Sequence, residues 1–184
     1  MDYRKNKEYV HVPVTIHGSV VEQVSEYKYL GTNISSNLDW SKNTLAVQRK
    51  ANQHLFFIRQ LKQIHLDNTL LVLFYKTVIQ SILVFNLTCF YGNLINQNRD
   101  KMDRPRKTAQ RIIGQELPIL ENLYNDKLFS KVNSIMKDPS HPLFDNYTFN
   151  RSGVRLRVPR SNKARYRQSF VPDSIHFFNS KVIR

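Results

Sequence analysis

The sequence is short of cysteine and glycine, and both shortages exclude classes of protein. Cys89 is the only cysteine in 184 residues, so no disulfide forms within the chain. A lone thiol fits a reducing compartment, and we expect an intracellular location in the cytoplasm or the nucleus. The six histidines show no metal-ligand spacing, and none of the five glycines belongs to a P-loop or another nucleotide-binding loop. We therefore expect no metal ion and no cofactor.

Acidic residues are scarce as well. The chain has 14 Asp and Glu against 28 Lys and Arg, which gives a net charge of +14. An excess of this size predicts a polyanionic partner. The longest apolar stretch, residues 70–90, is interrupted by Lys76 and Asn86, whereas a membrane span needs about 18 apolar residues with few charges. We expect this stretch to form a buried helix that includes Cys89, and we expect no membrane partner.

Strand patterns occupy the first part of the chain. Residues 10–16 and 20–24 are rich in β-branched side chains and flank a His-Gly dipeptide at residues 17–18, which is typical of a hairpin turn. Residues 27–34 predict a third short strand. Together these strands predict a small antiparallel β-unit over residues 8–36.

Helical periodicity begins at Ser41, which we expect to cap a long helix. A second helix is predicted from Asp67 or Asn68 through Phe90, and it is apolar almost all round, as expected for the central helix of a core. Trp40 lies at the corner between strand and helix, where a tryptophan can stack on a base but more often anchors the core, as we expect here. The apolar stripe of the first helix consists of Val47, Ala51, Leu55, Ile58 and Leu61.

Two more helices complete a predicted bundle over residues 41–136. The one at residues 98–113 contains Pro105, which weakens it because an interior proline costs about 3 kcal/mol. The other lies within residues 116–138. Residues 137–184 predict a proline-broken loop and a basic, partly disordered tail, and the fold class that follows is α+β.

The C-terminal residues carry much of the positive charge. Residues 151–184 contain nine Lys or Arg and one acid, so eight of the fourteen net positive charges lie there. Tyr166 and Phe170 are interleaved with these cations. Guanidinium groups pair with phosphate oxygens and aromatic rings stack on unpaired bases, so we expect contact with nucleic acid. The alternative is a solvated basic tail without a specific ligand.

Several segments resemble one family in the same order. The sequence Tyr-Leu-Gly at residues 29–31, a Leu-x-Trp turn and a basic amphipathic helix resemble the junction of palm and thumb in non-LTR (LINE-type) retrotransposon reverse transcriptases. Residues 47–61, 108–124 and 137–144 resemble further parts of that family, as does the Arg-rich region after them. The resemblance implies that residues 8–36 end a palm-like domain and that residues 41–136 form its thumb-like bundle.

The resemblance also implies what the residues do. In that family Tyr-Leu-Gly closes the hairpin that supports the primer terminus, and the parent activity is RNA-directed DNA polymerisation. Gly31 would then let the backbone approach a polynucleotide end, whereas the residues alone favour a glycine that relieves a bend in the strand. The family holds two Mg²⁺ ions with clustered carboxylates, and no Asp-Asp pair occurs in this sequence.

We therefore expect a non-catalytic remnant that binds RNA or an RNA–DNA hybrid, without enzyme activity. The alternative is a protein-interaction or inert structural module, and the sequence makes no prediction of oligomeric state. The residues that we predict to contact nucleic acid are Tyr29, Leu30, Gly31, Arg49, Lys50, Arg59, Lys62, Arg151, Arg155, Arg157, Arg160, Lys163, Arg165, Tyr166 and Arg167.

A second resemblance covers residues 47–83. They are similar to the N-terminal module of AlkB-type tRNA-modifying enzymes, which carry a 2-oxoglutarate/Fe(II) dioxygenase domain and a methyltransferase domain. His65, Asp67, His141 and Arg151 give the outline of a metal triad with a 2-oxoglutarate arginine. Such a triad belongs in a β-sheet, whereas the intervening residues predict helices and Asp67 predicts a helix cap. We assign no catalytic residue, and an AlkB-type enzyme is the distant alternative.

Overall fold

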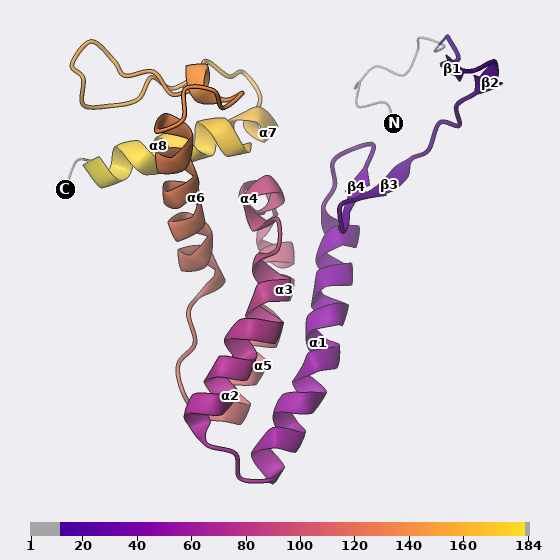
Figure 1. The fold of residues 1–184 in the computed structure, drawn as a ribbon, viewed down its shortest axis with the longest axis vertical. Coiled ribbons are helices and arrows are strands. Elements are labelled where there is room, and N and C mark those ends of the chain that lie inside the picture. The colour runs from indigo at the N-terminus through magenta and orange to yellow at the C-terminus, as the bar shows by residue number, and fades with distance from the viewer. Residues whose placement is uncertain (1–11, 183–184) are drawn as a thin grey trace.

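The computed structural model describes residues 12–182 (Figure 1). Two small antiparallel sheets of two strands each are followed by a mainly helical region, which confirms the predicted α+β class. Helices α1, α2, α3 and α5 lie side by side and form a bundle (Figure 1). The predicted first strand starts at residue 10, so its first two residues lie outside the described part of the chain.

The first sheet is a minimal hairpin. Strand β1 (Thr15–Ile16) pairs with β2 (Ser19–Val20), and the turn between them is the predicted His-Gly dipeptide. Both turn residues have positive φ, 48° at His17 and 79° at Gly18, as a two-residue hairpin turn requires. The hairpin is shorter than predicted, and all four strand residues are exposed.

The second sheet corrects the prediction of a single strand at residues 27–34. Strand β3 (Glu26–Tyr29) pairs with β4 (Thr32–Ser35), and Tyr29 lies opposite Thr32. The two residues between the strands have φ values of 44° at Leu30 and 82° at Gly31. These values define a type I′ turn, which matches the twist of paired strands. The residues therefore form a second hairpin.

Helix α1 (Ser41–Gln63) buries the predicted stripe against helix α5. Ala51, Leu55 and Ile58 are buried, and Val47 and Leu61 pack against them from the edge. The prediction that Ser41 caps this helix is wrong. Asp39 Oδ1 accepts hydrogen bonds from the Ser41 backbone N–H at 2.9 Å and from the Ser41 hydroxyl at 2.7 Å, so a carboxylate two residues before the helix satisfies its first backbone N–H.

The second apolar stretch is less regular than predicted. It comprises α2 (Asn68–Phe74), a π-helical turn (Tyr75–Gln80) and α3 (Ser81–Val84). Phe85 is then extended and Asn86 has a φ of 50°, which ends the helix before the short α4 (Leu87–Phe90) and the 3₁₀ turn Tyr91–Asn93. The predicted cap is confirmed, because Asp67 Oδ1 accepts from the Thr69 backbone N–H at 2.7 Å.

The core of the bundle lies along this stretch. Leu71, Tyr75, Ile79 and Leu83 are almost fully buried, whereas Cys89 is exposed, contrary to its predicted place in the core. By length and composition alone, residues Asn68–Asn93 are apolar enough to cross a membrane, with a mean hydropathy of 1.8. In the fold they supply the apolar partners of α1 and α5.

Helix α5 (Asn96–Ile113) continues through Pro105 without a break. Pro105 is buried, and the neighbouring Arg106 is also buried and holds both carboxylate oxygens of Asp103 at 2.6 and 2.7 Å. The Arg106 guanidinium also donates to Gln110 and to the backbone carbonyl of Leu117. Packing and this ion pair thus outweigh the helix-breaking effect expected of the proline.

The C-terminal residues are more ordered than the prediction of a partly disordered tail. After α6 (Leu120–Met136), the chain forms a 3₁₀ turn (Phe144–Asn146), α7 (Ala164–Arg167) and α8 (Phe170–Val182). Helix α8 packs on α6, as Figure 1 shows. A second small core joins them, formed by Val132, Ile135, Tyr147, Leu156 and Ile175.

Candidate nucleic-acid interface

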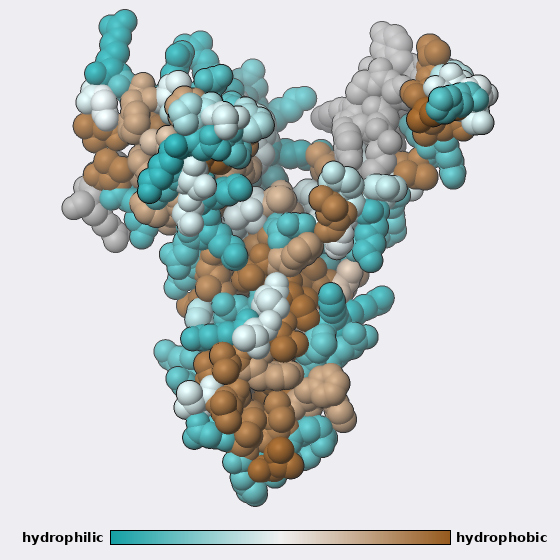
Figure 2. Space-filling model, viewed as in Figure 1, coloured by the Kyte–Doolittle hydropathy of each residue, from teal (hydrophilic) through white to brown (hydrophobic). Residues whose placement is uncertain are grey.

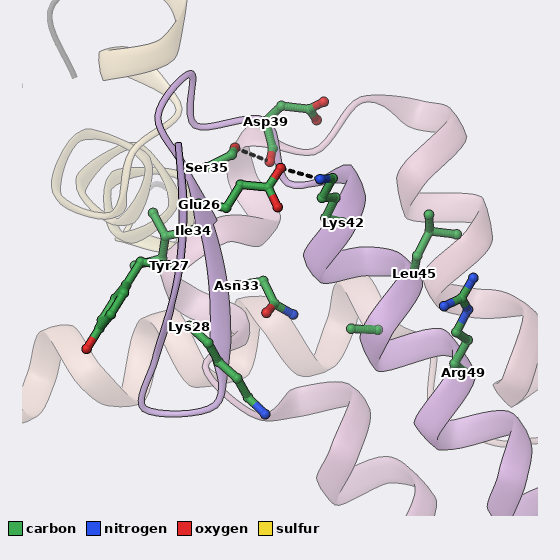
Figure 3. Close-up of a pocket in the computed structure, with 11 residues that line it drawn as sticks. Glu26, Tyr27, Lys28, Asn33, Ile34, Ser35, Asp39, Lys42, Leu45 and Arg49 are labelled. Carbon is green, nitrogen blue, oxygen red and sulfur yellow. Dashed lines mark hydrogen bonds and ion pairs between the residues drawn. The ribbon is translucent and has the colours of Figure 1, made fainter. Parts of the chain in front are cut away.

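A groove lies between the second hairpin and the first half of α1 (Figure 3). We call it the hairpin groove, and it encloses about 440 Å³. Its strand side includes Tyr27, Lys28 and Asn33, and its helix side includes Lys42 and Arg49. The hairpin is held against the bundle by two hydrogen bonds, from the Asn33 backbone N–H to Asn43 Oδ1 and from Asn86 Nδ2 to Thr32 Oγ1.

The charges of the hairpin groove are mixed. Of the residues that the structure describes, three cations and two carboxylates line it, and Lys42 forms an ion pair with Glu26. Hydrogen bonds from the Ser41 hydroxyl and backbone lower the pKa of Asp39, which therefore stays ionised at neutral pH. Within residues 12–182, no carboxylate lies at ion-pair distance from Lys28 or Arg49.

The Tyr-Leu-Gly residues do not line this groove. Tyr29, Leu30 and Gly31 form the exposed tip of the hairpin, and Leu30 is 72% exposed. A Cβ added at Gly31 would lie 3.1 Å from Cε1 of Phe85. The turn geometry and this close contact account for the glycine, so the close approach of a polynucleotide remains only a prediction of the resemblance.

The four basic residues that we predicted on α1 are all exposed. At 100° per residue, however, Arg49, Lys50, Arg59 and Lys62 point in different directions around the helix, and only Arg49 lines the hairpin groove. The helix contains no acidic residue over Ser41–Gln63. The α1 cations therefore spread positive charge around the helix rather than along one stripe.

Sequence reasoning missed the face of α1 that lies opposite its core stripe. Five side chains on this face are separated by seven, four, three and four residues along the sequence. On an α-helix these spacings place all five within about 40° of one direction. All are exposed, and the helical period of the sequence was the signal that could have identified them. This outer face of α1 consists of Lys42, Arg49, Gln53, Phe56 and Gln60.

Apolar side chains gather at the other end of α1. Figure 2 shows a brown surface where α1 joins α2. Exposed apolar residues of these two helices and their connection include Phe57, Ile64, Leu70 and Leu73. The hairpin groove and this apolar surface therefore lie at opposite ends of α1.

The Arg-rich segment, residues 151–167, carries seven cations and no acid. All seven cations are exposed, and no carboxylate of the described residues lies within ion-pair distance of them. The segment is anchored at Leu156, which is buried and exchanges two hydrogen bonds with the Asn179 side chain, at 2.8 and 2.9 Å. Arg155 and Arg157 flank this anchor and point outward by exposure. Nothing in the sequence identified Asn179 as the anchor.

A second hollow of about 240 Å³ brings the Arg-rich segment to the start of α1. We call it the Trp40 hollow. It is lined by Asp39, Trp40 and Asn98 from the bundle and by Arg165 and Gln168 from the end of the chain. Asp39 lines the hairpin groove as well, so the two hollows flank the same loop between β4 and α1. Of the predicted residues, only Arg49 and Arg165 line these two hollows.

The residues of the rejected metal triad are occupied otherwise. Asp67 caps α2, and His141 Nδ1 accepts a hydrogen bond from the Leu143 backbone N–H at 3.1 Å. His65 lies in the connection between α1 and α2 with a φ of 58°. Within residues 12–182, no three His, Cys, Asp or Glu side chains are grouped so that they could hold a metal ion.

The comparisons with known proteins bear on the first helices only. Residues 40–81 match the family model of the N-terminal region of alkylated DNA repair protein alkB homolog 8. The match spans α1, α2 and the π-helical turn, and it supports the AlkB-type resemblance for this helical module. No curated protein and no solved structure matches the chain.

Proposed function

We propose that this protein binds nucleic acid through the phosphate backbone and that it does not itself catalyse polymerisation. The observation that carries the proposal is the Arg-rich segment, whose seven cations are exposed and face no acid of their own segment. Guanidinium groups form bidentate hydrogen bonds with phosphate. The release of counterions from the nucleic acid then drives binding. The acid-free helix α1 adds five cations.

The finer proposal is that the chain is a remnant of a non-LTR retrotransposon reverse transcriptase. Its support is the ordered series of segments that resemble that family, together with a hairpin that leads directly into a basic helix. On this proposal the partner is RNA or an RNA–DNA hybrid. The polymerase carboxylates have no counterpart as an Asp-Asp pair in this sequence.

The test is the anisotropy of a labelled RNA–DNA hybrid with a single-stranded overhang, titrated with the full chain at several salt concentrations. If all seven cations of the Arg-rich segment contact a single strand, the logarithmic salt slope is about −5. The variant Arg155→Gln/Arg157→Gln/Arg160→Gln should reduce its steepness by about 2. Full-length variants are required, because Leu156 and Ile175 belong to the second core and truncation would expose it.

The matched control is Lys127→Gln/Lys131→Gln/Lys137→Gln. It removes the same charge from exposed positions on and beside α6. It should leave the salt slope close to that of the original chain. Equal salt slopes for the two triple variants would show that binding depends on net charge alone and not on the Arg-rich segment. The absence of binding at physiological salt would favour an interaction or structural module.

The family match to the alkB homolog 8 N-terminal region favours a second candidate, a protein related to AlkB-type tRNA-modifying enzymes. The matched residues contain no grouped metal ligands among the described side chains. A role of this kind would therefore use the module to bind, and the chemistry would need another domain. Succinate formation from 2-oxoglutarate with added Fe(II), or binding of S-adenosylmethionine measured by calorimetry, would overturn the proposal of a non-catalytic protein.

A further inference from the structure

The Trp40 hollow joins three segments that are distant in the sequence. The loop before α1 supplies Asp39 and Trp40, the start of α5 supplies Asn98, and the region around α7 supplies Arg165 and Gln168. A hollow built from a helix bundle and the Arg-rich segment is placed to receive a ligand that the segment binds. Its volume of about 240 Å³ suits a small planar group rather than a folded partner.

The aromatic wall of the hollow is well supported. Trp40 is partly buried and packs against the first core, and its ring centroid lies 5.6 Å from that of Phe90. Asn98 is 3% exposed, and its Nδ2 donates to Ser41 Oγ at 3.0 Å, which holds the amide in place. Aromatic rings of this kind provide a stacking surface for a base.

The polar groups of the hollow suit the edge of a nucleobase. Asn93, Asn98 and Gln168 line it, and side-chain amides both donate and accept hydrogen bonds. Among the described residues, Arg165 is the one cation in the lining and Asp39 the one carboxylate. One guanidinium can pair with one phosphate, whereas the ionised carboxylate in the same lining disfavours a polyphosphate.

We propose that the Trp40 hollow holds one unpaired nucleobase of a bound RNA strand, with Arg165 on the adjacent phosphate. This proposal rests on the proposed function, because it assumes that the Arg-rich segment binds RNA. It adds that the bound RNA is single-stranded at the hollow. Trp40 stacks on the base, and the amides of Asn98 and Gln168 contact its edge.

Trp40 is the only tryptophan in the chain, so its fluorescence reports on this hollow alone. The experiment adds a short labelled oligoadenylate RNA to the full chain and records both label anisotropy and Trp40 emission. An abasic RNA of the same length carries the same phosphates without bases. We expect both RNAs to raise the anisotropy and only the oligoadenylate to quench Trp40.

A matched pair of variants separates the hollow from general charge. Arg165→Gln and Arg167→Gln each remove one cation from α7, but only Arg165 lines the hollow. Arg165→Gln should abolish the quenching, and Arg167→Gln should retain it at saturating RNA. Circular dichroism of both variants checks that each is folded.

The outcomes distinguish the two proposals. Anisotropy without quenching, equal quenching by the abasic RNA, or full quenching of the folded Arg165→Gln variant overturns the base site and leaves the proposed function standing. The absence of any anisotropy change overturns both.

Discussion

Leu30 and Gly31 show how single residues determine the second hairpin. Both lie at positive φ in a two-residue turn, where Gly is favourable and Leu is not. The sequence predicted one strand here because Leu normally continues a strand, and two-residue turns are recognised by Asn-Gly or Asp-Gly. The left-handed conformation of Leu30 is therefore a local strain that the rest of the hairpin outweighs.

Leu30→Asn should stabilise this hairpin. Asn tolerates the left-handed region, whereas a residue such as Leu pays about 1 kcal/mol there, and Leu30 loses little packing because it is 72% exposed. Hydrogen exchange of the hairpin amides should slow about fivefold. The change Leu70→Asn, at an exposed helical position, serves as a control that should not slow exchange in the hairpin. Unchanged exchange in Leu30→Asn would show that the turn carries no strain.

The buried tyrosines predict how stability depends on alkaline pH. Burial raises the pKa of Tyr75, and the pKa of Tyr124 is raised by burial and by its hydrogen bond to Asp173. A phenol whose pKa is raised in the folded state binds its proton more tightly there than in the unfolded chain. It therefore contributes to the free energy of unfolding below the unfolded pKa near 10, and this contribution is lost as pH rises above that value.

Tyr75→Phe should therefore flatten the pH dependence of stability above pH ~10. The ring and its packing are retained, and only the titrating hydroxyl is removed. Urea unfolding near pH 8 and pH 11 would measure the free energy of unfolding of both proteins. We expect a smaller loss between the two pH values in the variant, and equal losses would contradict the assignment.

At the scale of the helices, the sequence correctly predicted local features whose form does not depend on contacts with other helices. The stripe of Ala51, Leu55 and Ile58 and the cap at Asp67 were both identified from the sequence. The left-handed Asn86 and the π-helical turn before it were not, because they satisfy contacts with the hairpin and with α1 that periodicity does not contain. The helix around Pro105 was predicted, and the structure adds that the proline is buried within α5.

Asp103→Asn tests the ion pair that accompanies Pro105 in α5. The side chains of Arg106 and Asp103 are 9% and 16% exposed, and removal of the carboxylate leaves a buried guanidinium without its counterion. We expect a loss of about 3 kcal/mol in the free energy of unfolding. The control Asp100→Asn, at an exposed position on the same helix, should change it by less than about 0.5 kcal/mol. Similar losses for both variants would show that the pair contributes no more than a surface charge.

At the scale of the whole molecule, the sequence identified the charge of the C-terminal region but not its attachment. The cations of residues 151–167 are visible in the composition, whereas Leu156, Asn179 and Asp173 hold the region in place through contacts across the chain. The Trp40 hollow depends on this attachment, since Arg165 and Gln168 reach it only when the end of the chain docks on the bundle. Such long-range contacts have no periodic signal in a sequence.

Gly92→Ala tests the docking directly. Gly92 lies in the 3₁₀ turn after α4, and a Cβ there would approach the Gln168 backbone carbonyl to 2.5 Å and the Tyr124 hydroxyl to 2.9 Å. Backbone must therefore shift, and we expect a loss of about 2 kcal/mol in stability together with displacement of α7. The displacement would separate Arg165 from Trp40.

Limited trypsin digestion measures this displacement, because the residues beside α7 are rich in Arg. Cleavage within residues 151–167 should be faster in Gly92→Ala than in the original chain. Gly153→Ala is the matched control: it is strained by its φ of 68° but meets no atom within 4 Å, so it lacks the steric conflict with α7. If Gly92→Ala were cleaved after Arg165 and Arg167 no faster than Gly153→Ala, the end of the chain would not be held by close packing at Gly92, and the Trp40 hollow would need another support.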